Sequence, residues 1–212
     1  MIVIIDGPPA SGKSTIATFL KHSCNAKIYC YKRLGFMNIV AKLLTKMAPH
    51  LQICDFVDKN FVDPVMIIDS NFLKRISFLT FYLEVMYKFL QYCLFFMYIL
   101  TKSDVVVDEG PSLGWANYLN LMLNKKALKP LHVDLLMRLD LQFFRALSRL
   151  CRLHIWFIDR HQEKLSMLWQ RKGGRSPYSI LFASLVRYSF KLFREASKRQ
   201  LINMRVRRLC LP

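Results

Sequence analysis

A glycine-punctuated stretch, GPPASGKS, runs from Gly7 to Ser14 near the start of the chain. It follows five apolar residues, and its pattern is G-x-x-x-x-G-K-[ST]. In such a pattern the glycines adopt backbone conformations that a Cβ would hinder, and successive backbone amides at a helix N-terminus surround a phosphate group. The sequence therefore predicts a phosphate-binding loop.

Each part of this loop has a predicted task. Lys13 would lie along the β- and γ-phosphate oxygens of ATP, and the hydroxyl of Ser14 would ligate Mg²⁺. A glycine-rich turn with a solvated lysine is the alternative, and the apolar strand before the loop and the helix after it argue against that alternative. The residues predicted to bind the nucleotide are Gly7, Pro8, Ala10, Ser11, Gly12, Lys13, Ser14 and Thr15.

Two carboxylates end another apolar run, DVVVDEG. Asp108 closes this predicted strand, where a carboxylate would hold Mg²⁺ directly or through water. Its neighbour Glu109 would orient or deprotonate the attacking group. The alternative for Asp108 is the N-cap of the following helix.

Basic residues occur at two further places that could meet phosphate. Arg171 and Arg175 flank two glycines in RKGGR, and we predict that they act as catalytic residues of a lid covering about 160–178. Arginines on a closing loop neutralise charge on the transferring phosphoryl group and exclude water. Lys32 and Arg33 follow the second predicted strand and would bind the acceptor. The alternative in both cases is a solvated basic loop.

The chain is strongly basic, and its charge is unevenly distributed. The net charge is +18, and residues 151–212 hold 14 Lys and Arg against three Asp and Glu. Such an excess attracts nucleotide phosphates, nucleic acid or an anionic membrane surface, or else forms a solvated face. We expect a nucleotide substrate first, with nucleic acid less favoured.

Strands alternate with helices along the 212 residues, which predicts one α/β domain covering 1–212 with a parallel sheet. Right-handed crossovers would place the phosphate-binding loop at the carboxyl edge of that sheet. No assignment is made for 51–70. The predicted strands are 1–5, 26–31, 104–110, 153–159 and 202–206. The predicted helices are 14–24, 37–47, 71–100, 113–124, 133–150, 162–170 and 178–198.

Residues 76–100 form the most apolar segment of the chain. The length would span a bilayer, but Glu84, Lys88 and Gln91 interrupt the segment. A helix that is apolar nearly all round lies in a core, in a subunit interface or in lipid. We favour a core or a homodimer interface over membrane contact.

Six cysteines are widely spread, without the spacing of a zinc site or of a disulfide framework. We interpret them as reduced thiols, and no basic region precedes the first apolar run, so a cytoplasmic location is expected.

The order of these motifs and predicted elements resembles that of the nucleoside monophosphate kinase group of P-loop proteins. Within this group it is most similar to the thymidylate-kinase-like branch. The resemblance rests on IIDGPPASGKST, YKRLGF, VVVDEGP and IWFIDRHQEKLSMLWQRKGGR, which span most of the chain. It implies a three-layer P-loop fold with a five-stranded parallel sheet, ATP·Mg²⁺ as donor, a nucleoside monophosphate as acceptor and, often, dimers through long apolar helices. The loop is equally similar to those of adenylate and cytidylate kinases, so the acceptor stays open.

Two other classes of function remain as alternatives. One is a polynucleotide or nucleoside kinase. In a polynucleotide kinase, the C-terminal basic excess would bind along the phosphate backbone of the substrate. The other is a nucleotide-dependent regulatory or membrane-associated ATPase that uses 76–100 as its anchor.

Overall fold

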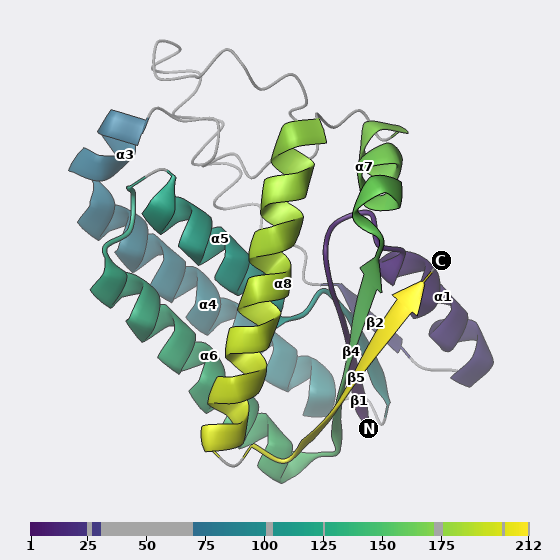
Figure 1. Ribbon diagram of the computed structural model, residues 1–212. Helices are drawn as coiled ribbons and strands as arrows, with labels where there is room; N and C mark the ends of the chain where they lie inside the picture. Colours follow the sequence, from purple (N-terminus) through teal and green to yellow (C-terminus); the bar gives the residue numbers. More distant parts are fainter. Residues whose placement is uncertain are drawn as a thin grey trace.

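A parallel β-sheet lies at the centre of the molecule (Figure 1). The computed structural model describes residues 1–24, 27–30, 70–100, 104–124, 126–171, 176–200 and 202–211. The sheet has five strands in the order β2-β3-β1-β4-β5, and every neighbouring pair is parallel. The strands are β1 (Ile2–Asp6), β2 (Lys27–Cys30), β3 (Val105–Asp108), β4 (Leu153–Arg160) and β5 (Met204–Leu211).

Helices cover both faces of this sheet (Figure 1). In Figure 1 helix α1 lies on one face, and α4, α5, α6 and α8 form a thick layer on the other. The α/β fold with a parallel sheet flanked by helices is therefore confirmed. The helices are α1 (Lys13–Cys24), α3 (Ser70–Arg75), α4 (Ser77–Leu100), α5 (Pro111–Leu123), α6 (Pro130–Leu150), α7 (Gln162–Arg171) and α8 (Ser176–Arg199).

The central strands β1 and β3 are apolar up to their last residue because both of their faces are buried. Ile2 and Ile4 of β1 join the large core beneath the helical layer, whereas Val3 and Ile5 join a smaller core beneath α1. Successive side chains of a strand point to opposite faces of the sheet. Where helices cover both faces, side chains on either face are therefore apolar.

Two predicted boundaries differ from the structure more than the others do. The single helix expected over 71–100 is divided at Ile76 into α3 and α4. The Thr80 hydroxyl donates to the carbonyl of Ile76, an interaction that bends helices, and the sequence pattern does not reveal it. The last strand extends to Leu211 rather than ending at 206, because it pairs with β4 along its whole length. The helix predicted over 37–47 and the segment 51–70 lie outside the described residues, apart from Ser70 in α3.

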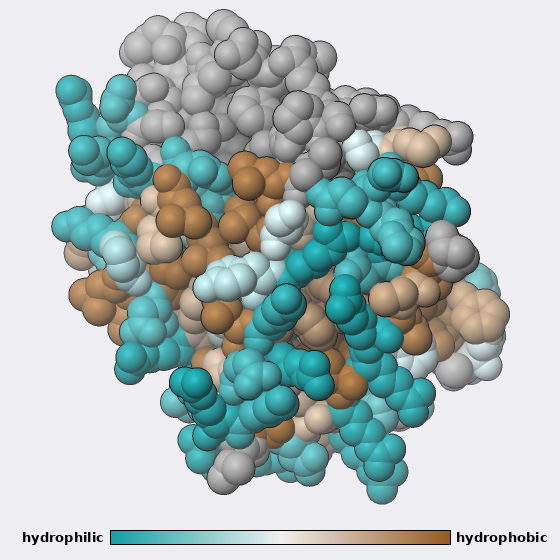
Figure 2. Space-filling model, viewed as in Figure 1, coloured by the Kyte–Doolittle hydropathy of each residue, from teal (hydrophilic) through white to brown (hydrophobic). Residues whose placement is uncertain are grey.

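Helix α4 has its polar residues inside and much of its apolar surface outside. Thr80, Glu84 and Gln91 are buried. The exposed large side chains on the helix are Phe78, Leu79, Tyr82, Met86, Phe89, Leu90, Leu94, Met97 and Leu100. By length and composition alone α4 is the one helix of the described residues that could cross a membrane. Apolar side chains gather over the helical layer, at the left of Figure 2.

Lys88 and Tyr92 of α4 belong to a buried network with α5 and α6. Lys88 forms an ion pair of 3.0 Å with Asp140 of α6. Tyr92 donates its hydroxyl to the same carboxylate, and the indole of Trp115 donates to it at 2.9 Å. Burial raises the pKa of Asp140, which the charge of Lys88 opposes. Lys88, one of the residues that interrupt the apolar segment in sequence, thus links α4 to α6.

Candidate nucleotide site at the carboxyl edge of the sheet

The loop between β1 and α1 turns through three residues with positive φ. These are Gly7 at 137°, Ala10 at 64° and Gly12 at 96°. A Cβ added to Gly7 would lie 2.1 Å from the backbone oxygen of Ile158 in β4, so glycine alone fits there. The strand–loop–helix arrangement that the GPPASGKS pattern requires is present.

The ammonium group of Lys13 lies across the inside of this loop. Its Nζ donates to the carbonyl oxygens of Gly7 and Pro8, both at 2.8 Å, and the residue is 8% exposed. A buried cation needs polar partners, and these two carbonyls supply them. The positive charge is therefore held at the centre of the loop, beside the backbone amides that would surround a phosphate.

Helix α1 begins at the end of the loop. The amide of Ile16 donates to the carbonyl of Gly12 at 3.2 Å, the first such bond of the helix. Ser14 and Thr15 are exposed on this first turn, so their hydroxyls are open to a ligand. The positive end of the α1 dipole lies at the same place. Within the described part of the chain, the buried Ser11 hydroxyl has no hydrogen-bond partner.

Asp108 lies beside the loop because of the strand register. It is paired with Ile5, the residue before the last position of β1. Its Oδ1 is buried and has no hydrogen-bond partner among the described residues. Asp108 and Ser14 both lie at the carboxyl edge of the sheet, and a carboxylate oxygen without a partner and an exposed hydroxyl are the hard oxygen donors that Mg²⁺ prefers. The residues present therefore fit the predicted magnesium site of Asp108 and Ser14.

Glu109 has an unusual backbone conformation. Its φ is 118°, a region that residues other than glycine rarely adopt, and its amide donates to the carbonyl of Ile5 at 3.1 Å. Such outliers are found most often at functional sites, where neighbouring structure holds them. Glu109 is thus fixed at the carboxyl edge, next to Asp108.

Asp6, which the sequence analysis did not single out, is fully buried at the end of β1. It accepts hydrogen bonds from the amide of Gly7 at 2.8 Å and from the hydroxyl of Ser112 at 2.6 Å. Burial raises its pKa, against the lowering effects of Ser112, Gly7 and the charge of Lys13. The available signal was its position, a carboxylate that ends an apolar strand directly before Gly7.

Arg160 is a second residue that the sequence analysis missed. It ends β4, and its Nε donates to the carbonyl of Ser11 at 3.0 Å. One of its terminal nitrogens lies 3.5 Å from where a Cβ on Gly12 would be. The guanidinium group therefore borders the outer side of the loop. A basic residue closing an apolar strand was the signal that could have revealed it.

An ion-pair cluster holds the segments behind Arg160. Asp159 accepts from Arg187 of α8 at 3.0 Å and from Arg208 of β5 at 2.7 Å. Arg187 also donates to the side chain of Gln162 and to the carbonyl of Arg160. Burial would raise the pKa of Asp159, but the hydrogen bonds and charges of the two arginines together lower it. The cluster ties β4, β5, α7 and α8 together.

Three of the four predicted lid and acceptor residues lie outside the described residues. Arg171 is the last residue of α7, and α8 begins at Ser176, so both helices flank the carboxyl edge (Figure 1). Arg175, Lys32 and Arg33 are outside the described residues. The roles of these four basic residues stay predictions.

The comparisons with known proteins give a fold and no family. No known protein family and no curated protein sequence matches the chain. Among solved structures, deoxyadenosine kinase from M. mycoides with bound dATP has a TM-score of 0.55 and 13% sequence identity, covering 99% of this chain and 91% of that one. The same enzyme with the products dCMP and dCDP has a TM-score of 0.52 at 9% identity, covering 99% and 90%. The chain therefore shares the fold of these deoxyadenosine kinase structures.

Proposed function

We propose that this protein transfers the γ-phosphoryl group of ATP to a small nucleoside-type acceptor. The observation that carries the proposal is the Lys13 ammonium group, buried inside a loop of positive-φ residues at the N-terminus of α1. A fixed cation and a ring of amides stabilise the charge that develops on a transferring phosphoryl group. The dATP bound by the structural neighbour supports a nucleoside triphosphate as the ligand.

In this proposal each residue at the carboxyl edge has one task. The loop and Lys13 would hold the β- and γ-phosphates, and Ser14 and Asp108 would hold Mg²⁺, whose positive charge would offset that of the phosphates. Arg160 supports the loop from outside through Ser11. Arg171 and Arg175 would approach the γ-phosphate from the lid, and Lys32 and Arg33 would bind the acceptor.

The reaction forms a bond between an acceptor oxygen and the γ-phosphorus, while the bond from that phosphorus to the β–γ bridging oxygen breaks and ADP leaves. A nucleoside monophosphate attacks through an oxygen that already carries negative charge. A nucleoside attacks through a hydroxyl, which must lose its proton to a base, and Glu109 is the carboxylate that we assign to this step. The two acceptor classes therefore place different demands on Glu109.

A nucleoside monophosphate is our first choice of acceptor, because basic residues follow β2 at Lys32 and Arg33. A nucleoside is the second, because the structural neighbours are deoxyadenosine kinases. ADP release should be measured with ATP, Mg²⁺ and each monophosphate or nucleoside in turn, using the wild type and E109Q. Turnover with monophosphates that survives in E109Q supports the first acceptor, and turnover with nucleosides that E109Q abolishes supports the second. ATP consumption that no acceptor stimulates would contradict both.

We also propose that a second copy of the chain covers the exposed face of α4. The apolar side chains on that face recur at helical spacing over its whole length, so two copies related by a two-fold axis would present the same row to each other. The buried Glu84 and Gln91 are consistent with this arrangement, because a helix between a protein core and an apolar partner keeps its polar groups on the core side. A membrane surface is the competing occupant.

A further inference from the structure

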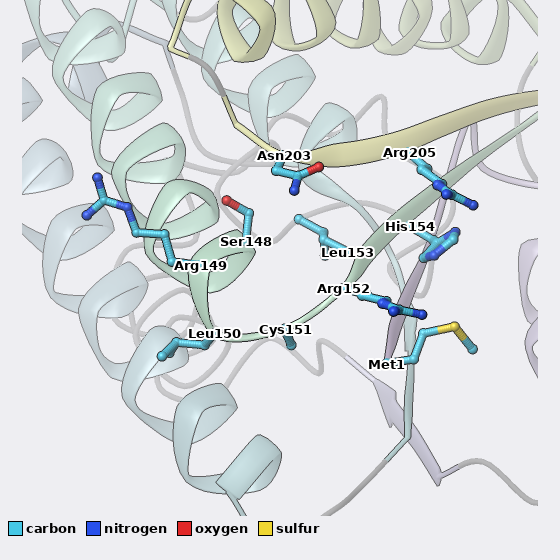
Figure 3. A pocket seen from close by; sticks show the side chains of 10 residues that line it. All are labelled: Met1, Ser148, Arg149, Leu150, Cys151, Arg152, Leu153, His154, Asn203 and Arg205. Carbon is cyan, nitrogen blue, oxygen red and sulfur yellow. The ribbon is translucent and has the colours of Figure 1, made fainter.

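The proposed reaction does not account for all the basic residues in the C-terminal third of the chain. Part of it surrounds a hollow of about 780 Å³ at the amino edge of the sheet (Figure 3). Arg149, Arg152, His154 and Arg205 line this hollow, together with Ser148 and Asn203, and no carboxylate side chain lines it. In Figure 3 the side chains of Arg152, His154 and Arg205 lie on one side, and Arg149 lies across from them.

The strand register brings these charges together. His154 of β4 is paired with Arg205 of β5, and Trp156 is paired with Arg207, so all four project from the same face of the sheet. Helix α1 packs against β1, β2 and β3, which leaves the β4–β5 half of this face less covered. Arg205 and Arg207 are exposed, and Trp156 is half-buried.

The arginines of this basic patch, which are Arg149, Arg152, Arg205 and Arg207, have no acidic partner among the described residues. Arg187 and Arg208, by contrast, share Asp159. Three of these arginines, Arg152, Arg205 and Arg207, act on His154. Burial lowers the pKa of His154, and the charges of Arg205, Arg207, Arg152 and the N-terminal amine lower it further. The last turn of α6 contributes about half a negative charge at this edge, which is small beside four arginines.

We propose that this hollow binds the phosphate backbone of a single-stranded nucleic acid, independently of the phosphate-binding loop. The arginines are spaced two residues apart along β5 and continue into the hollow, which suits an extended polyanion. A small anion would instead be held by enclosed, buried donors. The surface is concave, so a strand can enter it whereas a flat bilayer cannot. Beyond the hollow, the half-buried indole of Trp156 lies beside Arg207, where its exposed part would stack on a base of the single strand.

The hollow and the loop lie at opposite ends of β4. From His154 to Arg160 is six residues of extended strand, about 20 Å. Occupation of the hollow therefore leaves the loop open to ATP, and the two sites can be tested separately.

The test measures the binding of a labelled oligothymidylate by fluorescence anisotropy over a salt series, with saturating ATP present. Four arginine contacts predict a slope of log affinity against log salt concentration of about −2.8. In R152A/R205A the slope should fall to about −1.4, and the affinity should fall about tenfold or more. The control is K191A/R194A, which removes the same charge from exposed positions of α8 outside the hollow. We expect it to bind as the wild type does.

Three outcomes would overturn the proposal. The first is equal binding by the wild type and R152A/R205A when both unfold at the same temperature. The second is equal weakening in K191A/R194A, which would indicate a diffuse basic surface. The third is displacement of the oligonucleotide by inorganic phosphate or by vesicles containing phosphatidylserine, when the competitor supplies no more phosphate groups than the oligonucleotide does. Acceptor-dependent ADP release should be unchanged in R152A/R205A, so failure here is separate from failure of the proposed kinase activity.

Discussion

The carboxylate of Asp6 accepts two hydrogen bonds from Ser112, a residue 106 positions further along the chain. The hydroxyl of Ser112 donates at 2.6 Å and its amide at 3.0 Å. A Cβ on Gly110 would lie 2.3 Å from the carboxyl carbon of Asp6, so the close approach requires glycine there. The end of β1 and the start of α5 are therefore joined by a buried carboxylate, which holds Asp108 and Glu109, the residues just before α5, beside the loop.

Replacing Lys13 by alanine should abolish phosphoryl transfer and leave the fold intact. Loss of a charged group that stabilises the transition state lowers turnover by about 10²–10³-fold or more. ATP-dependent ADP release gives the rate, and circular dichroism checks the fold. Turnover close to that of the wild type would refute the assignment of the phosphate-binding loop.

D108N should lower turnover by about 10²-fold and raise the Mg²⁺ concentration needed for half-maximal rate. A catalytic metal contributes several kcal/mol of charge stabilisation, and an amide is a poorer ligand than a carboxylate. The matched control is D104N, one residue before the same strand, where the carboxylate is exposed and paired with the N-terminal amine. If D104N and D108N show the same magnesium dependence, Asp108 is no metal ligand.

R175A should lower turnover more than it weakens ATP binding. An arginine that meets the γ-phosphate chiefly in the transition state contributes to kcat, whereas one that binds the ground state contributes to affinity. Steady-state rates and calorimetric ATP titration separate the two quantities. An unchanged rate would return Arg175 to a solvated basic loop.

Acid should weaken the ion-pair cluster around Asp159. Its pKa is lowered in the folded state, so the stability that it contributes is present above its ordinary value of 3.8 and is lost as the pH falls through the lowered pKa. D159N should lose about 1–3 kcal/mol at neutral pH and lack this acid dependence. Urea unfolding over a pH series measures both effects.

Asp6 provides the comparison for this experiment. Its pKa is raised, so its contribution has the opposite sign: it is present at low pH and is lost as the pH rises through the raised value. Relative to the wild type, D6N should therefore gain stability as the pH rises, whereas D159N should gain it as the pH falls. Parallel pH profiles for the two variants would contradict both assignments.

F89D should separate the proposed dimer. Phe89 lies near the middle of the exposed face of α4 and is 67% exposed, so a carboxylate there would face the partner in an apolar interface. A central interface residue of this kind is worth about 2–4 kcal/mol, which corresponds to about 10²-fold in dimer affinity. Sedimentation velocity measures the assembly.

The control for F89D is F19D, at an equally exposed phenylalanine of α1, 66% exposed. It should sediment like the wild type. A wild type that stays monomeric at high concentration, or that pellets with lipid vesicles through α4, would contradict the dimer and favour the membrane surface.

The strands were predictable because both of their faces are buried. β1 and β3 are short β-branched runs in the sequence, and turns follow each of them. The loop at Gly7 was predictable because its spacing reflects backbone conformation, which glycine reveals directly. By contrast, the orientation of α4 was not predictable. In an apolar helix with three polar residues, the sequence does not indicate which face packs against the core. Asp140, its buried partner, lies on a helix far along the chain.

The residues around the site that were missed act through tertiary contacts. Arg160 reaches the carbonyl of Ser11 across 149 positions, and Asp159 meets Arg208 across 49. No local pattern reports such a pairing. The β5 boundary was missed for a related reason: alternating arginines suggest a solvent-exposed end, whereas hydrogen bonding to β4 continues the strand.

Strand β4 also links the two ends of the sheet mechanically. Its carboxyl end touches the phosphate-binding loop at Gly7 through Ile158 and at Ser11 through Arg160. Its amino end carries His154. An extended strand that is hydrogen-bonded on both sides can neither shorten nor stretch appreciably, so β4 keeps the hollow and the phosphate-binding loop at a constant separation.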